Sequence, residues 1–546
     1  MILAERVRAV PRDLGVAFVR VRLGLLAQAG ALAAILAVVF LAYSRILSQW
    51  FVADDFWYLR AAQTASFGFV LNSFDYTAPG PVPEGMYRPL YPIAFLLTYK
   101  LFGLTAWQYH LLSIAVHMVN TVLVFLVARK LTGRASVAYI AAFIFGLHPA
   151  YAPAVAWITN NVSVFAMAFS LGSVLLFLNF LDGGPRRWLC YGGSFVGIIF
   201  AMLIHPESMA ALAAMVLAYL VRHVQSLEDL RSLRRYLPVL PYVIAAIALF
   251  GVLQYTRAND PYQKTVFTLG SHMATKFPIY VAHLGNPFGV NDLSWQHWRS
   301  LIPMLGVSLS AFWLLVAPKS FDLRVRLLVI VWFLLAVLPL TTYNVAIHSR
   351  KLYVAGVPFA LMMAMVAVAL SDWLAPRLRP LDLRSPDWRY TPIAAGLVLA
   401  AFALPLRTWQ VTDEPHMADA SLLHLDSQTY KAMTDQVRLT YPALPEGARL
   451  DLVWVPWPLL AFGVLDSPIA GVIDSPIADA IQIYYGEIEI FGVGDPSQLP
   501  PPNSLGRFLV GFTCPPVCGP PLPPELVAAI WQAQHPGQTL PSELEP

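Results

Sequence analysis

The sequence predicts an all-α polytopic membrane protein with a small β-containing soluble domain at its C-terminal end. Of its 546 residues, 58% are hydrophobic and 12% are charged, against about 25% charged in an ordinary soluble domain. Long apolar runs recur up to residue 406, and short strand-like segments between prolines and glycines follow from residue 407. We therefore divide the chain into a membrane domain, 1–406, and a C-terminal domain, 407–546.

About eleven apolar stretches have the composition of transmembrane helices, which need roughly 20 apolar residues each. They lie near residues 24–43, 107–128, 135–148, 162–181, 188–204, 208–221, 236–255, 300–317, 327–343, 352–371 and 391–406. Lys and Arg gather before the first stretch and in alternate connections, as expected on the cytoplasmic side. The N-terminus is therefore expected inside, with the first span uncleaved, and residues 407–546 outside a bacterial-type cytoplasmic membrane. A net charge of +4 does not suggest nucleic acid.

A long loop, 44–106, follows the first span and carries the adjacent carboxylates Asp54 and Asp55. Two acids this close repel unless water, a cation or a reacting group compensates them, and such pairs often supply one acid and one base. The alternative is a solvated loop with two ordinary acids. Further polar side chains fall on the same predicted outer face, namely His148, His205 and Glu207.

An arginine, Arg88, stands at the predicted membrane edge just before a proline-initiated helix. Free backbone N–H groups at a helix start, together with a guanidinium, suit an anion such as phosphate. Snorkelling to lipid headgroups is the alternative, and the same choice applies to Arg350 and Lys351. A transporter would place ionisable groups near the bilayer midplane, whereas these lie at span ends, which favours chemistry at the membrane surface.

The sequence gives weaker support for a functional role of four other residues. His117 and Asn120 share one helix face at i, i+3 spacing, and we expect interhelical hydrogen bonds there rather than catalysis. Trp157 and Asn160 are candidates for an acceptor groove, with wall packing as the alternative.

Several motifs in order resemble the membrane region of polytopic C-type glycosyltransferases, above all the transmembrane, tetratricopeptide-bearing O-mannosyltransferases. The resemblance covers roughly residues 50–220, with a second patch at 349–359. It rests on Tyr87-Arg88-Pro89-Leu90, Gly103-Leu104, Tyr109-His110-Leu111-Leu112, Leu147-His148-Pro149 and Ala154-Val155-Ala156-Trp157-Ile158.

This resemblance implies the C-type fold and transfer of a sugar, with mannose as one candidate, from a polyprenyl-phosphate donor at the outer face. A protein or a lipid-linked glycan would be the acceptor, in contact with membrane lipid. The family's acceptor-activating carboxylate maps onto Asp54 or Asp55, and we favour Asp54 as base with Asp55 as its orienting or metal-binding partner. Arg88 and Arg350, with Lys351, match the basic residues that hold the phosphate. The cofactor is left unknown, with a divalent cation on Asp54, Asp55 or Glu207 as one option.

The chain also departs from the family pattern. Pro153 stands where relatives have a glutamate, His205-Pro206-Glu207 replaces a Lys-Glu pair, and Ser349-Arg350-Lys351 replaces Glu-Arg. These differences bear on which donor and acceptor are used. A lipid-linked-saccharide transporter or a non-catalytic membrane scaffold is the alternative function.

The C-terminal domain replaces the tetratricopeptide repeats. Strands are expected at 450–455, 481–493 and 508–513, followed by a Pro-rich tail. A small disulfide loop between Cys514 and Cys518 is plausible if this end lies outside the cytoplasm.

Overall fold

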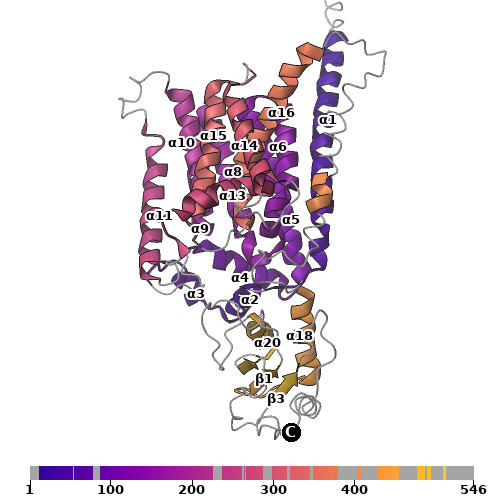
Figure 1. The fold of residues 1–546 in the computed structure, drawn as a ribbon, viewed down its shortest axis with the longest axis vertical. Helices are drawn as coiled ribbons and strands as arrows, with labels where there is room; N and C mark the ends of the chain where they lie inside the picture. The colour runs from indigo at the N-terminus through magenta and orange to yellow at the C-terminus, as the bar shows by residue number, and fades with distance from the viewer. Residues whose placement is uncertain are drawn as a thin grey trace, which may run out of the picture.

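In the computed structural model, the protein is a bundle of long helices with a small α/β lobe at one end (Figure 1). The structure describes residues 12–52, 54–77, 87–224, 236–260, 264, 266–286, 298–316, 320–344, 349–378, 403–408, 427–453, 476–485, 488–493 and 508–511.

The bundle consists of helices rich in Leu, Ala, Val and Phe, whose backbone polar groups are satisfied within each helix, as a bilayer requires. They are α1 (Arg12–Tyr43), α5 (Ala106–Thr132), α6 (Ala135–Leu147), α8 (Val162–Leu181), α9 (Arg187–Ile204), α10 (Met209–His223), α11 (Leu240–Asn259), α13 (His272–Gly285), α14 (Trp298–Val316), α15 (Leu323–Val337) and α16 (Gly356–Leu378). Among the described residues, seven helical segments are long and apolar enough to cross a membrane. The protein is an integral membrane protein.

Ten of the predicted spans coincide with helices of the bundle. The predicted span 391–406 lies mostly outside the described residues, which include a helical segment at 403–408 there, so the total of eleven stays a prediction. Sequence reasoning missed α13, because Lys276, Pro278 and His283 interrupt its apolar pattern.

Small residues let the helices of the bundle approach closely, as is typical of membrane helices. A Cβ added to Gly146 of α6 would lie 2.7 Å from Val39 Cγ2 of α1 and 3.2 Å from Thr121 Cγ2 of α5. No larger side chain fits there unless both neighbours move.

Three ion pairs tie helix ends together where the sequence predicted cytoplasmic connections. Asp182, after α8, pairs with Lys130 of α5 and, at a distance of 2.5 Å, with Arg222 of α10. Arg134 pairs with Asp372 of α16, also at 2.5 Å. Helix α5 starts next to the short helices of the loop 44–106 and runs for 27 residues away from them. These ion pairs therefore lie at the end of the bundle that is opposite to this loop, called the far end below.

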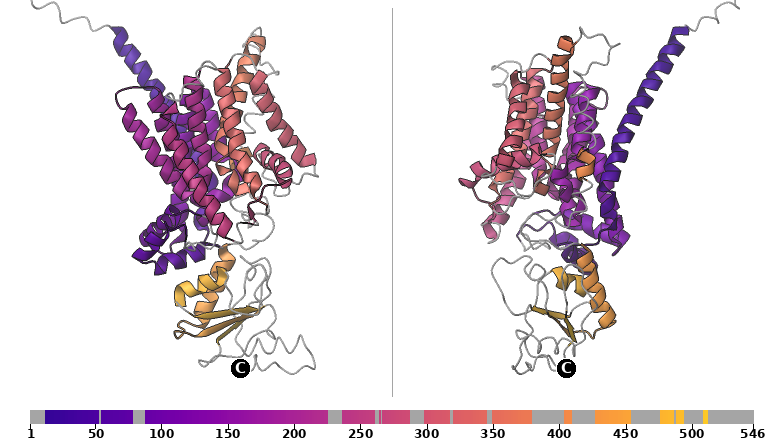
Figure 2. Two further views of the ribbon diagram at one scale, coloured as in Figure 1. Left: turned by 90° about the vertical axis from the view of Figure 1, so that its left-hand side faces the viewer. Right: turned by 45° about the vertical axis from the view of Figure 1, so that its right-hand side comes forward.

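The opposite end, which we call the site end, is built by short helices of the long loop (Figures 1 and 2). They are α2 (Asp54–Thr64), α3 (Phe67–Asn72) and α4 (Leu90–Phe102), preceded by the 3-10 helix η1 (Ser44–Ser48). Further short turns meet them from the bundle: η2 (Pro149–Tyr151), α7 (Ala152–Ala156), η3 (Ile158–Asn161), η4 (Pro206–Ser208), η7 (Leu338–Thr342) and η8 (Ser349–Tyr353).

Beyond α2 lies the C-terminal lobe, with helices α18 (Ser427–Thr440) and α20 (Pro476–Tyr485) on a parallel sheet. The strands β1 (Arg449–Val453), β2 (Glu489–Val493) and β3 (Phe508–Gly511) are ordered β2-β1-β3, with Arg449 opposite Glu489 and Leu450 opposite Phe508. The β content of the lobe is therefore as predicted.

The predicted strand over 481–493 is wrong in its first half, where the chain forms α20. Pro476 starts this helix, a position that proline tolerates well. Ile477, Ala480 and Ile481 are all buried, and their i, i+3, i+4 spacing is helical. The Pro-rich tail and the Cys514 and Cys518 pair lie outside the described residues.

Candidate functional site

Helix α2 begins with the two adjacent carboxylates. Asp55 is 1% exposed, and its Oδ2 accepts the Val52 N–H at 2.9 Å while its own N–H donates to Val52 O at 3.0 Å. This reciprocal pair caps the start of the helix, where the helix dipole also favours negative charge. Asp54, the first residue of α2, is partly exposed.

The other oxygen of Asp55 joins α2 to η3. Oδ1 accepts the Thr159 N–H at 2.9 Å. Burial raises the pKa of Asp55 from 3.8 to about 7, although the hydrogen bonds from Val52 and Thr159 oppose this rise. Asp55 therefore titrates close to neutral pH.

Trp157 lies between Asp55 and a cation. Its indole is close enough to the Asp55 carboxylate to lower the pKa of that group, and the Arg350 guanidinium stacks on the indole ring at 4.6 Å from the ring centroid. Within the described part of the chain, Trp157 Nε1 makes no hydrogen bond of normal length and angle, so it acts on Asp55 as a nearby N–H dipole. The structure thus connects the predicted carboxylate with one of the predicted phosphate ligands through one aromatic side chain.

A second cluster forms around the turn His205-Pro206-Glu207. Burial raises the pKa of Glu207, and the positive charges of Lys351 and Arg88 partly oppose the rise. The same two cations, added to the effect of burial, hold the pKa of His205 well below 6.5. All four predicted site residues of this cluster therefore interact, and His205 is neutral at physiological pH.

Lys351 is additionally held by aromatic rings. Its Nζ lies 3.2 Å from the ring centroid of Tyr343 and 5.8 Å from that of Phe267. Tyr343 follows η7, and no sequence signal singled it out, since its approach to Lys351 depends on long-range packing.

Both His-Pro turns use histidine in the same way. His148 Nδ1 accepts the Ala150 N–H at 3.2 Å, and His205 Nδ1 accepts the Glu207 N–H at 3.4 Å. In each case the ring caps a 3-10 turn that starts with proline. His148 Nε2 donates to Leu284 O at 2.8 Å, so both of its ring nitrogens serve the backbone, an arrangement that fits a structural role.

Asn160 is the partly exposed residue of η3. Its backbone N–H donates to Trp157 O at 3.1 Å, which keeps Asn160 and Trp157 in one tight turn. The structure therefore places both candidates for an acceptor groove beside Asp55.

A buried hydrogen-bond network anchors η8, the turn that carries Arg350 and Lys351. Tyr353 OH donates to His117 Nδ1 at 2.8 Å and accepts from Asn120 Nδ2 at 2.9 Å. His117 Nε2 donates to Gly146 O at 3.1 Å, which fixes the tautomer. The prediction that His117 and Asn120 make interhelical hydrogen bonds is confirmed.

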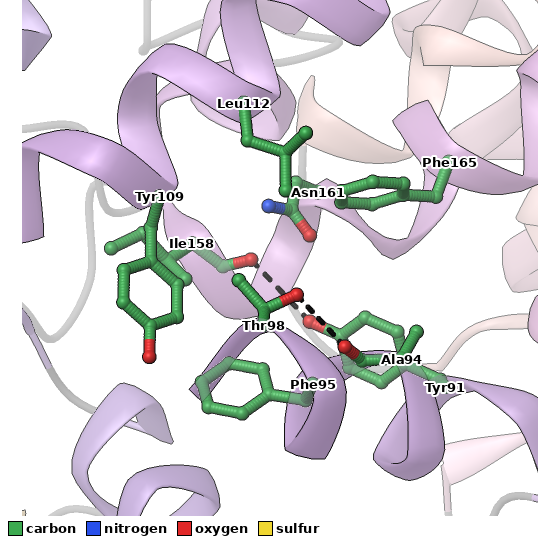
Figure 3. A pocket seen from close by; sticks show the side chains of 9 residues that line it. All are labelled: Tyr91, Ala94, Phe95, Thr98, Tyr109, Leu112, Ile158, Asn161 and Phe165. Carbon is green, nitrogen blue, oxygen red and sulfur yellow. Dashed lines mark hydrogen bonds between the residues drawn. The ribbon is translucent and has the colours of Figure 1, made fainter. Parts of the chain in front are cut away.

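A small pocket lies behind the Asp55 site, between α4, α5 and η3 (Figure 3). Its volume is about 20 Å³, enough for about one water molecule and far below the roughly 300–1,000 Å³ of ligand pockets. Tyr91 OH donates to Thr159 O at 2.7 Å across its edge. The pocket is too small for a sugar. The residues around it, such as Tyr91, hold the backbone of Thr159 in place.

Metal binding finds little support in the described ranges, where no group of three or more His, Cys, Asp or Glu side chains is close enough to hold an ion. The site is instead rich in cations, with Arg88 and the adjacent Arg350 and Lys351 gathered from two parts of the chain.

Fold and site together define a polytopic helical membrane protein whose carboxylates, aromatic rings and cations meet at one end of the bundle. Residues 83–255 match the family model described as dolichyl-phosphate-mannose-protein mannosyltransferase. The resemblance drawn from the sequence motifs is confirmed for this part of the chain. Asp54, Asp55, Arg350 and Lys351 lie outside the matched range.

Among curated proteins, the chain is similar to human protein O-mannosyl-transferase TMTC1, with 31% identity over 180 residues that cover 31% of this chain and 20% of the relative. Protein O-mannosyl-transferase Tmtc2 of Drosophila melanogaster is 30% identical over 134 residues, or 24% of this chain and 14% of the relative. The chain thus spans about a fifth or less of the length of these relatives.

Two solved structures share low identity with the chain. ArnT from Cupriavidus metallidurans, bound to undecaprenyl phosphate, aligns with a TM-score of 0.47 and 12% identity over 93% of this chain and 95% of ArnT. The oligosaccharyltransferase AglB from Archaeoglobus fulgidus, in complex with an inhibitory peptide and a dolichol-phosphate, aligns with a TM-score of 0.46 and 13% identity over 86% of this chain and 64% of AglB.

Proposed function

We propose that the protein is a membrane glycosyltransferase that moves a sugar from a polyprenyl-phosphate donor to a protein or a lipid-linked glycan. The observation that carries this proposal is that Asp55 accepts the Thr159 N–H of the turn whose Trp157 ring stacks on Arg350. The names of the similar curated proteins make mannose the first sugar to test.

The two aspartates have different roles in this proposal. Asp54 is the base, because it is partly exposed at the start of α2. Asp55 orients α2 and the surrounding backbone, because it is buried and each of its oxygens already accepts a backbone N–H. A group in that position does not reach an acceptor.

In the transfer step, the acceptor hydroxyl oxygen attacks the anomeric carbon while the bond from that carbon to the phosphate oxygen breaks. The hydroxyl proton passes to the Asp54 carboxylate, and the bonding electrons leave with the polyprenyl phosphate. Arg88, Arg350 and Lys351 stabilise the charge on the departing phosphate. Glu207 attracts Arg88 and Lys351 in the absence of donor, so it competes with the phosphate for these cations.

The site end faces the extracytoplasmic side of a bacterial-type cytoplasmic membrane in this proposal. The N-terminus is then cytoplasmic, and residues 407–546 form an extracytoplasmic domain. The ion pairs of Lys130, Arg134 and Arg222 at the far end support this orientation, since basic residues favour the cytoplasmic side.

The test supplies labelled polyprenyl-phosphate mannose to the purified full chain in lipid vesicles, with a Ser- and Thr-rich peptide or a polyprenyl-linked glycan as acceptor. Label is expected in the acceptor, and Asp54→Asn should abolish its transfer. Asp435→Asn is the matched control, because Asp435 lies on the exposed face of α18.

Equal transfer by wild type, Asp54→Asn and Asp55→Asn would show that the carboxylates have no role in the reaction. Movement of labelled lipid across the vesicle membrane without a new glycosidic bond would identify a transporter. Donor binding with neither outcome would identify a scaffold.

A further inference from the structure

Helix α2 lies between two bodies, the helix bundle and the C-terminal lobe (Figure 1). Tyr58 faces α4, with its ring 5.3 Å from that of Tyr91 and 5.2 Å from that of Phe95. Asp55, one turn earlier, bonds Thr159 on the same side. Positions 55 and 58 thus form the stripe of α2 that packs on α4 and η3, on the side away from the lobe.

A second stripe of α2 packs on the lobe. The Phe56 ring lies 5.3 Å from the ring of Tyr430 in α18. Arg60 Nη1 pairs with Asp479 Oδ1 of α20 at 3.1 Å, and Gln63 Nε2 donates to Ile483 O at 3.2 Å. The spacing 56, 60 and 63 is that of one helix face.

This second contact has a continuous apolar core. Phe56 and Leu59 belong to the same cluster of buried side chains as Met433, Ile477 and Ile481 of the lobe. The Asp479 side chain is only 8% exposed and that of Arg60 is 30% exposed, so the ion pair lies at the edge of this core. The lobe is therefore packed on α2 rather than tethered to it.

An 11-residue helix such as α2 is too short to be stable alone, since isolated helices below about 12–15 residues are marginal in water. Its position must come from what it packs against. If the contact of α2 with the lobe is weakened, the whole short helix moves, including its first turn with Asp54 and Asp55. Misplacement of a reacting group by about 1 Å can cost about 100-fold in rate.

We propose that the C-terminal lobe is a positioning element for the acceptor side of the site, with Arg60 and Asp479 as positioning residues that hold α2. This inference rests on the proposed function for its kinetic part. Its structural part, the dependence of the Asp55 to Thr159 contact on the lobe, stands independently of any activity.

The first experiment measures backbone hydrogen exchange in the full-length protein, in wild type, Arg60→Gln and Asp479→Asn. Both variants are expected to speed exchange at least tenfold in peptides covering α2 and in the peptide containing Thr159, with a thermal midpoint close to that of wild type. Asp435→Asn removes the ion pairs of Asp435 with Lys431 and Arg438 elsewhere in the lobe, and it should leave both peptides unchanged. Unchanged exchange in all variants would overturn the proposal.

The second experiment measures sugar transfer by the same proteins. Arg60→Gln and Asp479→Asn are expected to lower kcat about tenfold or more while KM for the lipid donor stays the same, because the phosphate ligands are not on α2. Arg60→Lys keeps the positive charge that faces Asp479 and should retain most of the activity. A rise in KM with unchanged kcat, or a Lys variant as impaired as the Gln variant, would contradict the positioning role.

The two experiments separate the proposals. If the wild type transfers no sugar from any donor, the proposed function fails, and hydrogen exchange still decides whether the lobe holds α2.

Discussion

Asp55 Oδ1 accepts the backbone N–H of Thr159 at 2.9 Å across 104 residues of sequence. This bond fixes α2 against the turn that carries Trp157, and Trp157 in turn lies under Arg350. One carboxylate thus sets the distance between the acceptor side of the proposed site and the phosphate side.

The burial of Asp55 predicts a pH dependence of stability. Its pKa of about 7 in the folded protein exceeds the usual 3.8, so folding favours the protonated carboxyl. The contribution of this group to the free energy of unfolding is therefore complete below about pH 4 and is lost as the pH rises to about 7, a change on the order of a few kcal/mol. Urea unfolding in detergent at pH 5, 6, 7 and 8 should show a weaker pH dependence for Asp55→Asn than for wild type. Parallel pH curves would contradict this.

Removing either cation beside Glu207, Lys351 or Arg88, is expected to weaken binding of the lipid phosphate. Lys351→Met and Arg88→Met should each weaken binding of polyprenyl phosphate about tenfold or more, since charge-assisted contacts contribute about 1.5–3 kcal/mol. Titration calorimetry with the lipid in nanodiscs measures this. Lys100, exposed on α4, provides the control variant Lys100→Met, which should bind as wild type does. An equal loss in all three would point to general lipid attraction.

The buried hydroxyl of Tyr353 is expected to contribute to the stability of the protein. Tyr353→Phe leaves His117 Nδ1 without its donor and removes one acceptor of the Asn120 amide, so the free energy of unfolding should fall by about 1–3 kcal/mol. Tyr139→Phe loses a bond to Gln28 O at 2.9 Å at a partly exposed position, and it should cost less. The midpoints of thermal unfolding of the two variants measure this difference in stability. Equal midpoints would argue against a tightly packed network around Tyr353.

Two glycines with different surroundings give a packing test. A Cβ on Gly285 of α13 would lie 2.6 Å from the backbone oxygen of Pro303 in α14, whereas one on Gly172 of α8 meets nothing within 4 Å. Gly285→Ala should therefore destabilise the protein by about 1–3 kcal/mol. Gly172→Ala should be neutral or stabilise by up to about 1 kcal/mol. Thermal midpoints that move together would contradict the close contact of α13 and α14.

Much of the bundle could be predicted from sequence, because each long apolar run specifies its helix locally. Predictions were poorer where the pattern is broken or mixed. Helix α13 carries a lysine and an internal proline. The strand expected over 481–493 overlaps the second half of α20, whose buried residues repeat with helical spacing. The β1 and β3 segments, with alternating or continuous apolar residues, were located correctly.

The candidate residues of the site were chosen from sequence, but their relationships were not. Nothing in the local sequence indicates that Asp55 is buried while Asp54 is partly exposed, since this follows from contacts with Thr159 and Trp157 about 100 residues away. The pairing of Lys351 with Tyr343 and the packing of the lobe on α2 are likewise tertiary.

The ion pair between Arg60 and Asp479 joins residues 419 positions apart, and this separation has a consequence for biosynthesis. At about 5–20 residues per second of chain elongation, α2 leaves the ribosome roughly 20 to 80 seconds before its partner helix exists. During that interval the apolar face of α2 that later contacts the lobe has no lobe to cover it. The nascent chain must therefore keep α2 at the membrane surface or on a chaperone, and the contact of α2 with the lobe forms only after α20 has been made.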